Sequence, residues 1–266
     1  MKRLALVSLL IAGLASSATA GPIGDTGAFE LKRVYGYYYS NGGEFTIFAY
    51  GTSLTNESYS SAPGAATKDI SGALAPSFQT FCLELTEYAR TPDYFVVGSA
   101  AVKGGSSLSD ASYPYDPISK GTAWLYSQFA TGVLSVPLLG GTRDYFAPLG
   151  STRRLEAGLL QNAFWMLEGE LAASMANPYY AAAVSTFGTE EQARADASIG
   201  YLGVYVLNDF DTEAHRDAFV TNGSLVGVTQ DFLYLRTTAV PDGGATMTLL
   251  GGALLGLGAL RRKVRR

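Results

Sequence analysis

The chain contains a single cysteine, Cys82, and a glutamine, Gln161, that falls inside a strongly apolar segment. A cysteine thiolate is a strong nucleophile, and it can attack a nearby carboxamide and displace ammonia. The product is a thioester between the cysteine sulfur and the side-chain carbonyl of the glutamine. Because thioesters hydrolyse in water, the bond must lie in a dry, aromatic-lined pocket until a partner nucleophile reaches it. We expect Phe81, Phe164 and Trp165 to supply those walls.

Both residues also have simpler interpretations. A free cysteine often behaves as a small apolar side chain in a core, and a buried glutamine can be an amide whose hydrogen bonds are all satisfied. With one Cys and one His, the sequence excludes a disulfide framework and multi-cysteine or multi-histidine metal sites. We expect no cofactor, no metal and no turnover enzyme. A Cys82–His215 nucleophile–base pair is disfavoured because no hydrolase signature surrounds either residue.

Two elements must position the cysteine and the glutamine. Phe78–Leu85 alternates between two faces and predicts a strand that buries Cys82. A helix is predicted to begin near Ser151-Thr152, and its wide apolar sector indicates deep burial. Gln161 lies inside that segment, so a bond between the two side chains would join a strand to a helix.

The rest of the chain predicts strands, then helices, then strands again. Tyr- and Phe-rich runs flank Asn41-Gly42-Gly43, which is a hairpin signature. Asp116-Pro117 predicts the start of a helix, and Pro178–Ala195 predicts another. Returning strands are expected at Tyr201–Leu207, Leu225–Val228 and Asp231–Arg236. The fold class is therefore α+β and mainly β, a β-sandwich or barrel with an inserted helical subdomain.

The residues around the pair resemble the two motifs of the bacterial thioester domain. Phe81-Cys82-Leu83-Glu84 follows the first motif, and Leu160-Gln161-Asn162-Ala163-Phe164, with Trp165 after it, follows the second. The resemblance implies a β-sandwich or barrel with a helical subdomain and a Cys82–Gln161 cross-link. It also implies a surface adhesin that reacts covalently with a nucleophile on its target. The expected pocket shell consists of Phe81, Glu84, Asn162, Phe164 and Trp165.

Residues 1–20 have the three parts of a secretory signal peptide. Lys2 and Arg3 precede an apolar run, and Ala18-Thr19-Ala20 provides an A-x-A-like cleavage site. This pattern predicts export, with a thioester-like domain at residues 21–239.

Residues 240–266 predict a C-terminal sorting signal. Val240-Pro241-Asp242-Gly243-Gly244 is followed by an uncharged segment, 245–260, and then by an arginine-rich tail. As a helix, 245–260 would be about 24 Å long, which predicts a short transmembrane helix with its basic tail in the cytoplasm. This order resembles the PEP-CTERM exosortase signals of Gram-negative bacteria, in the variant that begins Val-Pro-Asp. The resemblance implies that a transpeptidase-like membrane enzyme cuts the tail.

The charge balance argues against a nucleic-acid partner. The whole chain has a formal charge of −4, and residues 21–239 retain 12 basic and 22 acidic residues, which gives them a net charge of about −10. A nucleic-acid-binding domain would normally present a basic face. The composition is instead typical of a soluble, acidic, extracellular surface.

We expect an exported protein at the cell surface or in the extracellular matrix of a Gram-negative bacterium, with transient contact to the inner membrane through 245–260. Its partners would be an exosortase-type processing enzyme and an unknown surface or matrix nucleophile, either an amine or a hydroxyl. The alternative is an inert structural or carbohydrate-binding matrix protein in which Cys82 is a core residue. Exposed aromatic side chains at Tyr37–Tyr39 would favour carbohydrate binding.

Overall fold

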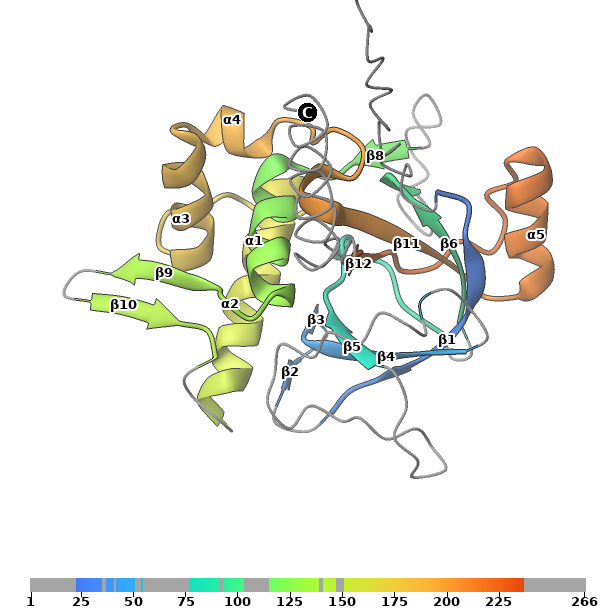
Figure 1. The fold of residues 1–266 in the computed structure, drawn as a ribbon, viewed down its shortest axis with the longest axis horizontal. Coiled ribbons are helices and arrows are strands. Elements are labelled where there is room, and N and C mark those ends of the chain that lie inside the picture. The colour runs from blue at the N-terminus through green and yellow to red at the C-terminus, as the bar shows by residue number, and fades with distance from the viewer. Residues whose placement is uncertain are drawn as a thin grey trace, which may run out of the picture.

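The computed structural model describes residues 23–34, 37–40, 42–50, 54, 77–90, 93–102, 115–138, 141–146 and 151–236. Within them, a twisted antiparallel sheet forms one part of the molecule and a group of helices packs beside it (Figure 1). This is the α+β, mainly β arrangement that the sequence predicts.

The main sheet has six strands in the order β12-β11-β6-β1-β4-β5. Each neighbouring pair is antiparallel. The sheet curls around an apolar interior, and its first and last strands, β12 and β5, approach each other. The strands are β1 (Thr26–Lys32), β4 (Phe45–Tyr50), β5 (Ser77–Thr80), β6 (Asp93–Gly98), β11 (Val204–Phe210) and β12 (Phe232–Leu235).

A short seam connects the two edges and makes the sheet nearly a closed barrel. The predicted strand at 78–85 is shorter than expected, because β5 ends at Thr80 and the chain continues in a different pairing. Cys82 forms an isolated antiparallel bridge with Phe232. On either side of it, the Leu83 amide donates to the Asp231 carbonyl at 3.0 Å and the Leu233 amide donates to the Phe81 carbonyl at 3.2 Å. The seam satisfies edge groups that would otherwise be unpaired, and Cys82 lies at its centre.

The helices form two groups. α1 (Lys120–Ala130), α2 (Ser151–Glu168), α3 (Pro178–Phe187) and α4 (Glu190–Arg194) pack together, and α1 also contacts β11 and β12. α5 (Glu213–Asn222) lies apart from them against β6 and β11 (Figure 1). Smaller elements complete the described fold: β2 (Tyr38–Tyr39), β3 (Gly42–Gly43), β7 (Ala100–Val102), β8 (Tyr115–Pro117), β9 (Ser135–Leu138), β10 (Gly141–Asp144) and a 3-10 turn at Tyr201–Gly203.

Two apolar cores meet at the seam. Phe81 faces the helical core, where its ring lies 4.9 Å from that of Phe129 and 5.1 Å from that of Phe164. Cys82 faces the barrel core with Phe45, Phe232 and Trp165. Successive side chains of an extended segment point to opposite faces. Phe81 therefore points into the helical core, and Cys82, the next residue of the predicted motif, points into the barrel core.

The start of α1 differs from the prediction. Asp116 and Pro117 lie in β8, which pairs with β7, so they are extended and do not cap the helix. Ser119 caps it instead, and its hydroxyl accepts a hydrogen bond from the Thr122 amide at 3.1 Å. A tertiary pairing thus overrides a local sequence signal.

The predicted helix at 178–195 is two helices. Gly188, at φ 88°, ends α3, and Thr189 then caps α4. The predicted strand at 225–228 is reduced to one bridge, between Val228 and Phe210. Strand β1 has no counterpart among the predicted elements.

A carboxyl group links the end of α2 to the start of α1. Oε1 of Glu168 accepts a hydrogen bond from the Ser119 amide at 3.1 Å. Burial raises the pKa of Glu168 from 4.5 to about 7, against the opposing hydrogen bonds from Thr122 and Ser119. Burial also raises the pKa values of Glu84, Asp209 and Asp231.

We predict that the protein loses stability as the pH rises from 5 to 8. Glu168 keeps its proton in the folded state up to about pH 7, whereas the unfolded chain releases it near pH 4.5. Since the folded state binds more protons in this window, its free energy of unfolding falls with pH. In Glu168→Gln that fall should shrink by about 2 kcal/mol, measured by urea unfolding at several pH values. Glu170→Gln is the matched control, and an equal change in both variants would contradict the assignment.

Candidate functional site

The side-chain amide of Gln161 lies against the main chain of Cys82. Oε1 of Gln161 accepts hydrogen bonds from the Cys82 amide at 3.1 Å and from the Gly43 amide at 3.1 Å. Nε2 of Gln161 donates to the Cys82 carbonyl at 2.8 Å. Gln161 is 1% exposed and Cys82 is 4% exposed. Helix α2 and the barrel seam are thus joined through the two residues that the sequence singled out.

Two glycines let the β2–β3 hairpin approach α2 closely enough for this contact. A Cβ atom on Gly42 would lie 2.6 Å from Cγ of Gln161 and 2.6 Å from Cη2 of Trp165. A Cβ atom on Gly158, which lies one turn before Gln161, would lie 2.7 Å from the ring of Tyr39. Any larger residue at Gly42 or Gly158 must displace these neighbours.

A buried ion pair fixes the segment that carries the Gly43 amide. Arg153 of α2 donates to both carboxylate oxygens of Glu44, at 2.8 Å and 2.9 Å. Tyr145 donates its hydroxyl to the same carboxylate at 3.0 Å. Burial raises the pKa of Glu44, and the bonds to Arg153 and Tyr145 oppose that shift. Because Glu44 follows Gly43 directly, the ion pair holds a donor to Gln161 in position.

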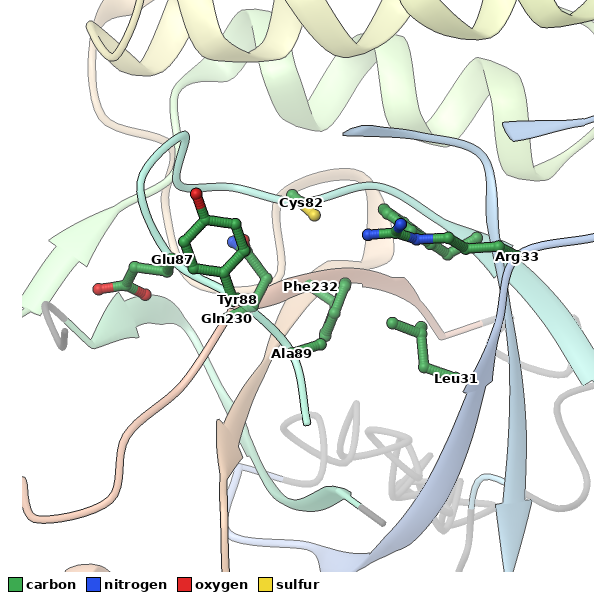
Figure 2. Close-up of a pocket in the computed structure, with 9 residues that line it drawn as sticks. Leu31, Arg33, Cys82, Glu87, Tyr88, Ala89, Gln230 and Phe232 are labelled. Carbon is green, nitrogen blue, oxygen red and sulfur yellow. The ribbon is translucent and has the colours of Figure 1, made fainter. Parts of the chain in front are cut away.

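Cys82 lines a cavity of about 240 Å³ whose other walls include Leu31, Phe45 and Phe232. Figure 2 shows the guanidinium of Arg33 extending toward the sulfur of Cys82, while the carboxylate of Glu87 points away from it. The guanidinium of Arg33 also lies 5.6 Å from the centre of the Phe45 ring. A fixed positive charge therefore faces the thiol.

Burial raises the pKa of Cys82 well above its ordinary value. The carboxylates of Glu84 and Glu87 raise it further, and the positive charge of Arg33 lowers it. The thiol of the folded protein is therefore protonated at neutral pH, and Arg33 is the charged group that favours its thiolate.

Glu84 has a supporting position. Its carboxylate accepts hydrogen bonds from the Gln230 side chain at 2.8 Å and from the Asp231 amide at 3.2 Å. The Asp231 carboxylate in turn accepts from the amides of Val102 and Asp209. Glu84 thereby holds the strand that pairs with the Cys82 segment, and it lines neither cavity of the site.

Gln161 lines a second cavity, of about 260 Å³. Its remaining lining residues are Tyr39, Ser40, Gly42, Leu85, Gly158, Asn162 and Trp165. The cavity beside Cys82 and the cavity beside Gln161 have no lining residue in common. The Gln161 side chain thus bonds to the main chain of Cys82, and each of the two residues lines its own cavity.

The residues predicted to form the pocket shell lie in different parts of the structure. Asn162 and Trp165 line the cavity beside Gln161, whereas Phe81 and Phe164 pack in the helical core and line neither cavity. No sequence pattern marks Arg33, the Gly43 amide or the Glu44–Arg153 pair as parts of the site. Asn41-Gly42-Gly43 predicts only a turn, and no local pattern indicates which helix that turn contacts.

His215 belongs to a different part of the molecule. Its Nδ1 lies 2.6 Å from Oδ1 of Asp211 at the start of α5, and it does not line the Cys82 cavity. The structure therefore gives no nucleophile–base pair between Cys82 and His215. In the described ranges, no cluster of three or more His, Cys, Asp or Glu side chains is placed to hold a metal ion.

The C-terminal residues 239–264 match the VPDSG-CTERM motif, with Gly243 at the serine position of that name. The chain therefore carries a PEP-CTERM-like sorting signal, which indicates an exported bacterial surface protein that an exosortase-type enzyme processes. Neither a curated protein nor a solved structure matches the chain.

The predicted signal peptide at 1–20 and the predicted membrane segment and tail at 240–266 lie outside the described residues. In the part of the chain that the structure describes, no helix is sufficiently long and apolar to cross a bilayer.

We predict that Gly42→Ala destabilises the protein by about 1–3 kcal/mol, because the added methyl group meets Gln161 and Trp165 in a packed environment. Urea unfolding provides the measurement. Gly141→Ala is the matched control, since a Cβ atom there has no neighbour within 4 Å and Gly141 has no left-handed φ. Equal effects at Gly42 and Gly141 would show that the hairpin does not press on α2.

Proposed function

We propose that Cys82 and Gln161 form an internal thioester through which the exported protein attaches covalently to a nucleophile on a partner surface or matrix. The observation that carries the proposal is the set of hydrogen bonds that holds the Gln161 amide against Cys82. The resemblance of the segments around both residues to the thioester-domain motifs supports the same chemistry.

The contacts of Gln161 fit the formation of the bond. Attack of the Cys82 sulfur on Cδ of Gln161 would place negative charge on Oε1. The Cys82 and Gly43 amides already donate to that oxygen, as an oxyanion hole does. The S–Cδ bond forms, the Cδ–Nε2 bond breaks, and the nitrogen takes up the thiol proton and leaves as ammonia. All atoms are accounted for in this step, and it needs no external oxidant.

The same surroundings fit a bond that must survive until a partner arrives. Both side chains are almost fully buried, so water has little access to the acyl carbon. A partner nucleophile would then bond to Cδ of Gln161, and the Cys82 sulfur would be the leaving group beside Arg33. Because the partner stays bonded to the Gln161 side chain, the protein acts once and is not a turnover enzyme.

The sorting signal is consistent with this role at a cell surface. We propose that the mature protein, residues 21–239, acts at the outer surface or in the extracellular matrix of a Gram-negative bacterium, after transient anchoring in the inner membrane through 245–260. Neighbouring polymers at that location would supply nucleophiles for the thioester to capture.

A second candidate is an inert structural or carbohydrate-binding matrix protein in which Cys82 is only a core residue. Its deep burial and raised pKa favour that account, because both properties suppress thiolate formation. The two candidates differ in one measurable property, the presence of a covalent bond between Cys82 and Gln161.

We predict that purified residues 21–239 have an intact mass about 17 Da below the calculated value, the mass of one ammonia. Methylamine should erase the deficit and leave an adduct on Gln161, identified by peptide mapping. Cys82→Ala and Gln161→Ala should both show their full calculated masses. A full mass in the unmodified protein, together with a free thiol that can be alkylated, would favour the inert candidate.

We also predict that Arg33 stabilises the thiolate of Cys82. In the Gln161→Ala background, where the thiol is free, Arg33→Gln should raise the pKa of Cys82 and slow its alkylation by iodoacetamide about 3–10-fold at pH 8. Arg154→Gln is the matched control, because Arg154 lies over the Tyr38 ring and does not line the Cys82 cavity. An alkylation rate that is unchanged in Arg33→Gln would show that Arg33 does not stabilise the Cys82 thiolate.

A further inference from the structure

The two cavities place the acyl carbon and the sulfur of the proposed thioester in different surroundings. The acyl carbon of the proposed thioester belongs to Gln161, which lines its own cavity, whereas Cys82 lines the other. An incoming nucleophile must reach a face of the acyl carbonyl group, and the sulfur is then expelled from the tetrahedral intermediate. The cavity beside Gln161 is therefore the route by which a partner arrives, and its lining selects the partner.

That lining is neutral. Among the described residues it contains no Asp, Glu, Lys or Arg side chain, whereas the cavity beside Cys82 contains both Arg33 and Glu87. A primary amine is an ammonium ion at neutral pH, and it would lose hydration in the Gln161 cavity without a carboxylate in this described lining to compensate. The charge pattern thus disfavours a lysine-like partner and favours an uncharged nucleophile.

The lining also combines aromatic rings with hydrogen-bonding groups. Tyr39, 42% exposed, and Trp165 present ring surfaces, and Asn162 and Ser40 supply polar side chains. An apolar face with a few placed polar groups fits a sugar ring, whose faces are apolar and whose edge carries hydroxyl groups.

We propose that the cavity beside Gln161 binds a neutral carbohydrate and that a sugar hydroxyl is the nucleophile that opens the thioester. This inference rests on the proposed function for its covalent step. In that step an O–Cδ bond forms, the Cδ–Sγ bond breaks, and the hydroxyl proton goes to the sulfur, which restores the Cys82 thiol. The product is an ester between Gln161 and the sugar. The cavity, at about 260 Å³, has room for one ring.

Binding can be tested separately from the covalent step. Cys82→Ala cannot form the thioester, so its affinity for methyl glucoside, methyl galactoside and methyl N-acetylglucosaminide, measured by saturation-transfer NMR, reports on the cavity alone. We expect at least one of them to bind, and Tyr39→Ala to weaken that binding at least fivefold. Asn162→Leu, which keeps the side-chain size, should weaken it similarly.

Tyr88→Ala is the matched control for Tyr39→Ala. Tyr88 is also an exposed tyrosine, 70% exposed, but it lines the cavity beside Cys82. Its removal should leave sugar binding unchanged. No binding of any of the three glycosides, or equal losses in the Tyr39 and Tyr88 variants, would overturn the inference.

The covalent step is tested with the unmodified residues 21–239, by intact mass after incubation with the bound glycoside or with methylamine at equal concentration. A glycoside adduct that disappears in Gln161→Ala confirms the inference. An ammonia-sized deficit that only methylamine erases leaves the proposed function in place and overturns the hydroxyl nucleophile. Sugar binding without any mass deficit rejects the thioester but retains the carbohydrate site.

Discussion

The hydrogen bonds between the Gln161 amide and the Cys82 main chain are the constraint on which the site depends. They join α2 of the helical group to the seam of the sheet, the two places that must be held together if the chain is to form one reactive bond. The Gly43 amide adds a third element, and the buried Glu44–Arg153 pair holds that element to α2. Moving any of these elements would alter the geometry at Cδ of Gln161.

The charges around the pair are distributed unequally, and this asymmetry organises the chemistry. Cys82 lines a cavity that contains Arg33 and Glu87, while Gln161 lines a partly aromatic cavity whose described lining is neutral. Polar groups concentrated on the thiol side favour charge separation there, whereas the other side favours an uncharged ligand. One buried contact thereby separates two environments with different selectivity.

The burial pattern of the sequence was sufficient to predict the helix that carries Gln161. The choice of Cys82 and Gln161 as a pair came from the resemblance to the thioester-domain motifs, because no local pattern encodes a contact between them. The sequence was not sufficient for the supporting groups. Arg33, Glu44 and Arg153 are far apart in the chain, and only the folded arrangement of β4, α2 and the seam brings them to the site. The misplaced start of α1 has the same origin, since β7 holds Asp116 and Pro117 extended. Contacts between distant segments leave no periodic signal in a single sequence.

The position of Cys82 in the seam has a mechanical consequence. A partner bonded to Gln161 would pull on α2, while a surface tether would pull on the chain that follows β12. The covalent path between those two points runs through residues 161–236 and leaves the strands before α2 outside the line of force. The force would then reach β12, which is held by β11 on one side and by the seam on the other. The seam would therefore act as a clamp that resists extraction of the terminal strand under tension.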